Sequence, residues 1–314
     1  MVQGEGMKVA LPLKALGLVL VFAFSGVQIP SGSAEGDPII VAAGDIACDP
    51  GDASFNGGAG SANACRMKVT SDLAASINPV AVLPLGDNQY EDGTLPKYQQ
   101  SYEPTWGRLK SITHPAVGNH EYLQPRASGY FSYFGPAAGD PTKGYYSYNL
   151  GAWHLIALNS NCPQAGGCRA GSPQELWLKA DLAASPAFCT LAYWHHPRFS
   201  SGLHGTDPVY DAFWRALYQG RADVVLVGHD HDYERFAPQD PNGAADRLRG
   251  IREFVVGTGG RSHYRFRTLE PNSEVRDSGT FGVLVMTLRP TGYDWRFVPE
   301  PGRSFTDAGS ASCH

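Results

Sequence analysis

Short apolar runs that stop at a polar side chain, most of them just after a glycine, recur along this chain of 314 residues. They are "VAAGD", "LPLGD" and "VLVGHDH", together with the segments "HPAVGNHE" and "AYWHHP". Apolar runs of this length predict buried strands, and a glycine lets the backbone approach a site closely. The chain is therefore expected to gather Asp, Asn and His side chains at strand ends. The residues concerned are Asp45, Asp87, Asn119, His120, His195, His196, His229 and His231.

Helical patterns alternate with the early strands, whereas the later strands pair locally. "SPQELWLKADLAAS" opens with a capping box in which Ser172 is the N-cap and Glu175 is the third helical residue. "DPVYDAFWRALYQG" has Pro208 near its start and Gly220 at its end. "YYSYNL" with "WHLIALNS", and "FGVLVMTL" with "YDWRFV", predict hairpins. We expect a layered α/β fold with ligand groups in loops at strand ends. No linker is visible, so residues 35–314 are expected to form a single domain.

The first 34 residues have the pattern of a secretory signal peptide. Lys8 and Lys14 are its basic residues, residues 15–27 its apolar core, and "GSA" ending at Ala34 its cleavage site. We expect a secreted protein whose mature form has no membrane span. An uncleaved N-terminal anchor is the alternative.

The charge balance argues against nucleic-acid binding. The formal net charge is −5, and it becomes −6 if Glu5, Lys8 and Lys14 leave with the predicted signal peptide. A mildly acidic chain without a Lys/Arg run is unsuited to following a phosphate backbone. Attraction for an anionic substrate must then come from a local feature such as a bound metal ion.

All six cysteines are expected to be structural, because none has C-x-x-C spacing and an exported protein favours disulfides. Six cysteines allow 15 pairings. Cys162 and Cys168 bracket the turn-rich "PQAGG", and Cys48 with Cys65 would close a Gly-rich surface loop. The remaining pair, Cys189 with Cys313, would attach the C-terminus to the core.

The predicted strand ends offer a mixed set of carboxylate, amide and imidazole ligands. Such sets suit zinc, iron or manganese. There are too many ligands for one catalytic metal ion, but the number suits two ions that share a carboxylate. Two ions arranged in this way act as a clamp for phosphoryl chemistry.

The series GD, GDxxY, GNHE, HxP and GHxH resembles the calcineurin-like metallophosphoesterases, in particular the purple acid phosphatase branch. The blocks run from residue 44 to residue 231. The resemblance implies a four-layer sandwich in which two mixed β-sheets are flanked by helices. It also implies two ligand sets: Asp45, Asp87, Tyr90 and His231 for metal 1, and Asp87, Asn119, His195 and His229 for metal 2, with Asp87 bridging.

Tyr90 fills a gap in the first block. Most members of the wider family have D-x-H there, but this chain has Asp45-Ile46-Ala47, and alanine cannot bind a metal. The purple acid phosphatase branch uses a tyrosine three residues after the second-block aspartate, which is Tyr90 here. A phenolate favours Fe(III), so we expect Fe(III) at this position and a divalent ion (Zn, Fe or Mn) at the other.

The remaining histidines are assigned by the same resemblance. His120 resembles the family histidine that contacts the phosphoryl or leaving group, and His204 resembles a second one. The H-x-P pattern selects His195 as the ligand, and the adjacent His196 could orient it. His120 and His204, with Asn119, would form the catalytic set.

The resemblance implies an enzyme that hydrolyses small phosphomonoesters by attack of a metal-activated hydroxide, and the signal-peptide pattern predicts that this enzyme is secreted. The nearest alternative is a phosphodiesterase or nucleotide hydrolase that uses the same site. Two alternatives from other classes are a non-catalytic secreted phosphate- or metal-binding protein and an interaction protein.

Overall fold

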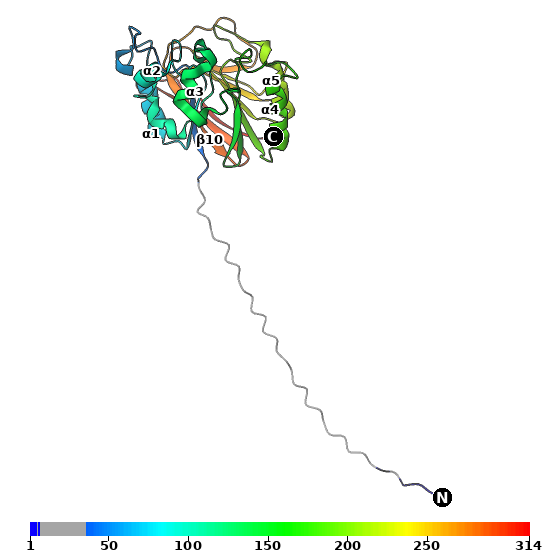
Figure 1. Cartoon of the computed structure of the whole chain (residues 1–314). Helices are drawn as coiled ribbons and strands as arrows, with labels where there is room; N and C mark the ends of the chain where they lie inside the picture. Colours follow the sequence, from blue (N-terminus) through cyan, green and yellow to red (C-terminus); the bar gives the residue numbers. More distant parts are fainter. Residues whose placement is uncertain (5, 7–35) are drawn as a thin grey trace. The chain divides into compact units, whose positions relative to one another are not determined.

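The computed structural model describes residues 1–4, 6 and 36–314. Gly36–His314 forms one compact unit, whose helices and strands are drawn in Figure 1. The predicted signal peptide and its cleavage site fall largely outside the described residues. Among the residues that are described, no helix has the length and apolar character needed to cross a membrane.

The first of two sheets has five strands in the order β12-β11-β10-β1-β2. β1 and β2 pair in parallel and the other neighbours are antiparallel. β10 and β11 form the predicted C-terminal hairpin. The strands are β1 (Ile39–Ala43), β2 (Ala81–Pro84), β10 (Gly282–Arg289), β11 (Gly292–Pro299) and β12 (Ala308–Ser312).

The second sheet has seven strands in the order β3-β4-β5-β6-β8-β7-β9. β4, β5, β6 and β8 are parallel neighbours, so their carboxyl ends meet at one edge, and β3, β7 and β9 pair antiparallel. The strands are β3 (Tyr146–Leu150), β4 (Trp153–Ala157), β5 (Cys189–Tyr193), β6 (Val224–Val227), β7 (Tyr233–Phe236), β8 (Arg252–Val256) and β9 (Ser273–Asp277).

Alternating side chains of the second sheet enter two different cores. In β6, Val224 and Leu226 join the large core that also contains Val41 and Leu284 of the first sheet. Val225 and Val227 join a second core with side chains of α4 and α5. This alternation is the period-two pattern of a strand that is buried on both faces.

Helices cover the outer faces of both sheets. α4 (Pro173–Ala184) and α5 (Asp211–Gln219) lie on the side of the second sheet, and α1 (Met67–Ile77) packs against β10 of the first sheet (Figure 1). The result is the predicted fold of two mixed sheets flanked by helices, which is confirmed. The other helices are α2 (Leu95–Lys97), α3 (Ser128–Phe134), a π-helix at Tyr98–Tyr102 and 3₁₀ turns at Asn56–Gly58, Trp106–Ile112, Glu121–Leu123, Pro125–Ala127, Gly135–Ala138 and Pro208–Tyr210.

The predicted start of α4 is correct, but the capping box is only half formed. The Ser172 hydroxyl accepts a hydrogen bond from the Glu175 N–H at 3.4 Å. The Glu175 carboxylate accepts from the N–H of Gly171 at 3.1 Å rather than from that of Ser172. The hydrogen bond made by the Glu175 side chain is thus shifted by one residue from the usual capping-box position. Together the two hydrogen bonds still satisfy two backbone N–H donors at the start of the helix.

The three disulfide bonds are those predicted: Cys48–Cys65, Cys162–Cys168 and Cys189–Cys313. The third joins the start of β5 to the C-terminal segment across 124 residues. The first closes the Gly-rich loop between β1 and α1.

Candidate metal centre

The predicted ligands Asp45, Asp87, His195 and His229 come from loops that directly follow β1, β2, β5 and β6, whereas Asn119 lies in a later loop, after the 3₁₀ turn Trp106–Ile112. Close backbone packing brings these loops together. Gly86 has φ of +84°, and a Cβ there would lie 2.6 Å from the His195 side chain. A Cβ on Gly118 would lie 2.1 Å from Asp87 Oδ1. The glycines before Asp87 and Asn119 are therefore required by the approach of one ligand loop to another.

The other three predicted ligands of metal 1 converge on the phenol oxygen of Tyr90. That oxygen lies 2.8 Å from Asp45 Oδ1, 3.1 Å from Asp87 Oδ2 and 3.0 Å from His231 Nε2. His231 Nε2 is also 3.3 Å from Asp45 Oδ1. The phenol oxygen is thus within hydrogen-bonding distance of two carboxylates and one imidazole.

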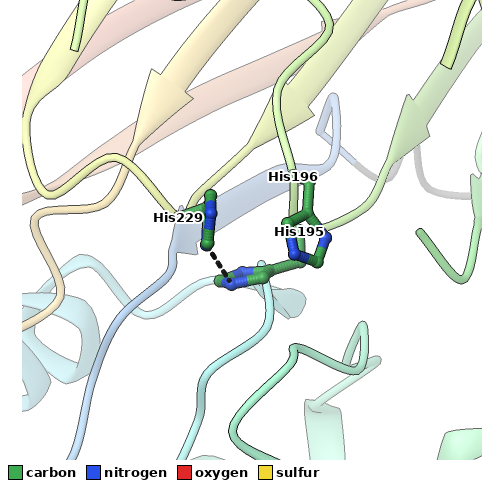
Figure 2. Close-up of side chains that lie close together, drawn as sticks. All are labelled: His195, His196 and His229. Atoms are coloured by element: carbon green, nitrogen blue, oxygen red, sulfur yellow. Dashed lines mark hydrogen bonds between the residues drawn. The ribbon is translucent and has the colours of Figure 1, made fainter. Parts of the chain in front are cut away.

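The other three predicted ligands of metal 2 converge on His195 Nε2. It lies 3.2 Å from Asp87 Oδ2, 3.0 Å from Asn119 Oδ1 and 3.1 Å from His229 Nδ1. Figure 2 shows the rings of His195 and His229 meeting across this last contact. Asp87 Oδ2 therefore belongs to both groups of ligand atoms.

These separations fit two metal ions. Bonds of about 2.1 Å from one ion to ligands at right angles place the ligand atoms about 3 Å apart. The observed spacings within both groups are 2.8 to 3.3 Å. An oxygen shared by both groups is what a bridging carboxylate requires.

Burial and charge at this site also favour a cation. Burial and the carboxylates of Asp45 and Asp87 raise the pKa of Tyr90 well above its usual value, so the phenol keeps its proton unless a cation replaces it. Burial opposes ionisation of Asp87, but His195 beside it lowers the Asp87 pKa overall. Burial alone would lower the pKa of His195, and the Asp87 carboxylate raises it to about 9.

Two of the imidazoles are held by their second ring nitrogen. His195 Nδ1 lies 2.9 Å from the Leu85 carbonyl oxygen, and His231 Nδ1 lies 2.9 Å from the Ser262 hydroxyl. The Tyr264 ring also stacks on the His231 ring at 4.0 Å. These contacts leave Nε2 of both histidines facing the ligand groups.

The adjacent histidines His195 and His196 make different contacts. His195 contacts the other predicted metal 2 ligands, whereas the contacts of His196 are with Ser160 and His229. His196 Nδ1 lies 2.8 Å from the Ser160 hydroxyl, and the His196 ring packs 4.3 Å from the ring of His229. Burial and the neighbouring His195 lower the pKa of His196 to about 3, which keeps this imidazole neutral. The contacts suit a residue that positions His229.

His120 and His204 flank the two ligand groups. The His120 N–H donates to Asp87 Oδ1 at 2.9 Å, and its ring packs 4.3 Å from the ring of Tyr90. The His204 ring packs 4.1 Å from the ring of His229. The structure thus places one of these histidines beside each predicted metal position.

Asp230 is fully buried and holds the loop that carries His204. Its carboxylate accepts hydrogen bonds from the His204 N–H at 2.8 Å and from the Ser200 hydroxyl at 2.5 Å. The residue between His229 and His231 therefore couples the metal ligands to the His204 loop.

Glu121 fastens two ligand loops to each other. This fully buried carboxylate accepts hydrogen bonds from the backbone N–H groups of Asn88 and Gly118, at 2.9 and 2.7 Å. Burial, with a further contribution from Asp87, raises the pKa of Glu121 to about 7. Sequence reasoning treated Glu121 only as the last letter of a motif.

Arg261 is another residue that sequence reasoning missed. The Arg261 guanidinium lies 5.3 Å from the centre of the Tyr90 ring. It forms ion pairs with Asp52 at 3.1 Å and Glu91 at 2.5 Å. The loop closed by Cys48 and Cys65 thereby contacts the metal 1 side of the site.

Comparisons with known proteins agree with this geometry. The family model described as "Calcineurin-like phosphoesterase" matches residues 39–233. Purple acid phosphatase 21 of Arabidopsis thaliana is 30% identical over 213 residues, which are 59% of this chain and 47% of that protein. The Fe(3+)-Zn(2+) purple acid phosphatase 12 of the same plant is 28% identical over 218 residues, 58% of this chain and 44% of that protein.

The solved structure of a purple acid phosphatase from yellow lupin seeds has a similar fold. It superimposes with a TM-score of 0.73 at 18% identity, covering 88% of this chain and 53% of that one. The matched part of this chain spans 47% of Arabidopsis purple acid phosphatase 21 and 44% of purple acid phosphatase 12, which is less than half of each protein.

Proposed function

The chain belongs to the calcineurin-like phosphoesterase family, and from this premise we propose that it is a metal-dependent hydrolase of phosphate monoesters. One observation carries the proposal: Asp87 Oδ2 lies between the Tyr90 oxygen and His195 Nε2, at 3.1 and 3.2 Å. A carboxylate shared between two ligand groups is suited to two metal ions rather than one.

The proposed ligands are Asp45, Asp87, Tyr90 and His231 for metal 1, and Asp87, Asn119, His195 and His229 for metal 2. When bound, the two ions would supply a nucleophile near neutral pH and polarise the phosphoryl group. The similarity to an Fe(3+)-Zn(2+) purple acid phosphatase supports Fe(III) beside Tyr90 and a divalent ion at the other position. The specific metals are part of this proposal.

The protein's own groups would position the ester and handle the proton. The Asn119 amide, held by its contact with His195, is suited to orient a phosphoryl oxygen. His120 has 25% of its side chain exposed beside Asp87, so it can reach both solvent and substrate. We assign to His120 the donation of a proton to the leaving oxygen, and to His204 a contact with the phosphoryl group.

Export of the protein is a further part of the proposal. Three disulfide bonds favour an oxidising compartment, and the first 34 residues have the pattern of a signal peptide. N-terminal sequencing of the protein recovered from culture medium would test this, with a start near Glu35 as the expected result.

The function is tested by comparing rates on p-nitrophenyl phosphate and bis(p-nitrophenyl) phosphate from acidic to alkaline pH, with and without chelator. We expect a preference for the monoester and a loss of turnover on metal removal. A preference for the diester would support the phosphodiesterase or nucleotide hydrolase alternative. Turnover of neither ester by the metal-loaded protein would favour the non-catalytic binding alternative.

Replacing Tyr90 by phenylalanine should abolish a visible charge-transfer band of the iron-loaded protein. The phenol oxygen is the only atom removed, and it lies within 3.1 Å of Asp45 and Asp87. Absorption spectra and metal analysis of the two proteins, loaded identically, would measure the effect. Tyr264→Phe is the matched control, because Tyr264 stacks on His231 through its ring. A variant that keeps both the band and the full iron content would contradict the assignment of Tyr90 as a ligand.

A further inference from the structure

A cavity of about 710 Å³ lies beside the segment that follows His120. Its lining includes the rings of Tyr122 and Phe131 and two prolines, and among its polar groups are the side chains of Arg126 and Gln164. This mixture of an apolar surface with a few polar groups is typical of small-molecule sites.

Both walls of the cavity continue from loops of the metal centre. Tyr122 lies in a turn closed by its N–H to the Asn119 carbonyl at 3.1 Å, so it is one turn away from a proposed metal 2 ligand. Gln164 belongs to the loop after β4, in which the Ser160 hydroxyl contacts His196 at 2.8 Å. The two walls also meet directly, where Asn159 Nδ2 donates to the Tyr122 hydroxyl at 2.8 Å.

Arg126 gives the cavity a positive charge. Its side chain makes no hydrogen bond or ion pair with any residue that the structure describes, and the residue is exposed. A guanidinium that is free of carboxylates can form paired hydrogen bonds with an anionic group. The neighbouring rings offer faces on which a planar group can stack.

We propose that this cavity binds the leaving group of the substrate, and that it favours organic phosphates whose leaving group has an aromatic or apolar body and a second negative charge. Tyr122 and Phe131 contact the body and Arg126 pairs with the charge. The inference rests on the proposed function, because the phosphoryl group must be held at the metal centre for the leaving group to reach the cavity.

Two matched aryl esters test the proposal: phenyl phosphate and para-carboxyphenyl phosphate. Arg126→Ala should lower the ratio of kcat/KM for the carboxylated ester to that for phenyl phosphate by about threefold to fivefold, the size of one partly exposed ion pair. Arg126→Lys should keep a ratio close to that of the wild-type protein, because lysine retains the positive charge. Differences in leaving-group chemistry cancel, because each protein is compared on the same two esters.

Arg221→Ala is the control. Arg221 is exposed like Arg126, and its φ of +60° is close to the +56° of Arg126. Alanine must therefore adopt the same left-handed backbone conformation at both positions. Arg221 precedes β6, at the end of the strand opposite His229. An unchanged ratio in Arg126→Ala, or an equal change in Arg221→Ala, would overturn the leaving-group site while leaving the phosphatase function intact.

If neither ester is turned over, the proposed function fails, and the cavity is tested by calorimetry with para-hydroxybenzoate. Binding to the wild-type protein that weakens severalfold in Arg126→Ala would support the site. No binding, or equal binding to both proteins, would refute it.

Discussion

Replacing Asp87 by asparagine should remove metal from both positions and abolish turnover. The carboxylate contacts the Tyr90 oxygen on one side and His195 Nε2 on the other, so one substitution weakens both ligand groups. Removing a residue that hydrogen-bonds to a metal ligand typically lowers metal affinity or activity by about 10- to 100-fold. For a shared ligand we expect a loss of about 10³-fold or more in kcat, measured together with metal content by elemental analysis.

Asp223→Asn is the matched control for Asp87→Asn. Asp223 is also buried, and it accepts a backbone hydrogen bond from Thr190 at 2.8 Å, but it precedes β6 at the edge of the sheet away from the ligands. This variant should keep its metals and its turnover. If Asp87→Asn kept full metal content and normal turnover, the shared-carboxylate arrangement would be wrong.

The strand ends could be predicted because two simple rules coincide there. Buried strands such as β5 and β6 are short apolar runs, and their parallel order brings the residues that follow them to one edge of the sheet. Their loops then place His195 and His229 close together without any long-range contact being known in advance. The disulfide pairs could be proposed because two of the three bonds close short loops, which leaves one pair for the remaining cysteines.

Strands with weaker patterns could not be predicted. β9 has alternating partial exposure and contains Glu274 and Arg276, and β12 consists of small residues. Both lie at sheet edges, where pairing with a neighbour replaces hydrophobic burial as the reason for extended structure. β7 begins shortly after the proposed ligand His231, and its polar sequence gave no apolar run to recognise.

The residues that hold the predicted ligands in place could not be identified from the sequence, because their contacts join segments that are distant along the chain. Ser262 reaches His231 from a loop 31 residues away, and Glu121 reaches Asn88 across 33 residues. Asp230 is adjacent to two ligands in sequence, yet its role depends on the approach of the His204 loop. A polar residue in a glycine-rich loop gives no indication of which distant imidazole it will orient.

Replacing His120 by alanine should leave both metals in place and slow turnover by about 10²-fold, the usual contribution of a positioned proton donor. The His120 side chain is partly exposed, and its ring packs 4.3 Å from that of Tyr90 without joining either ligand group. The backbone N–H that donates to Asp87 remains in the variant. Metal content should therefore stay normal, which separates this variant from Asp87→Asn.

The size of the loss in His120→Ala should depend on the leaving group. p-Nitrophenolate departs readily without a proton, whereas an alkoxide does not, so a proton donor matters more for an alkyl phosphate. We expect a larger fall in kcat for glycerol phosphate than for p-nitrophenyl phosphate. His114→Ala, which removes a histidine stacked on Tyr148, should change neither rate. Equal losses on both esters would assign His120 to holding the phosphoryl group, and unchanged turnover would remove it from the reaction, because only a donor to the leaving oxygen can distinguish the two esters.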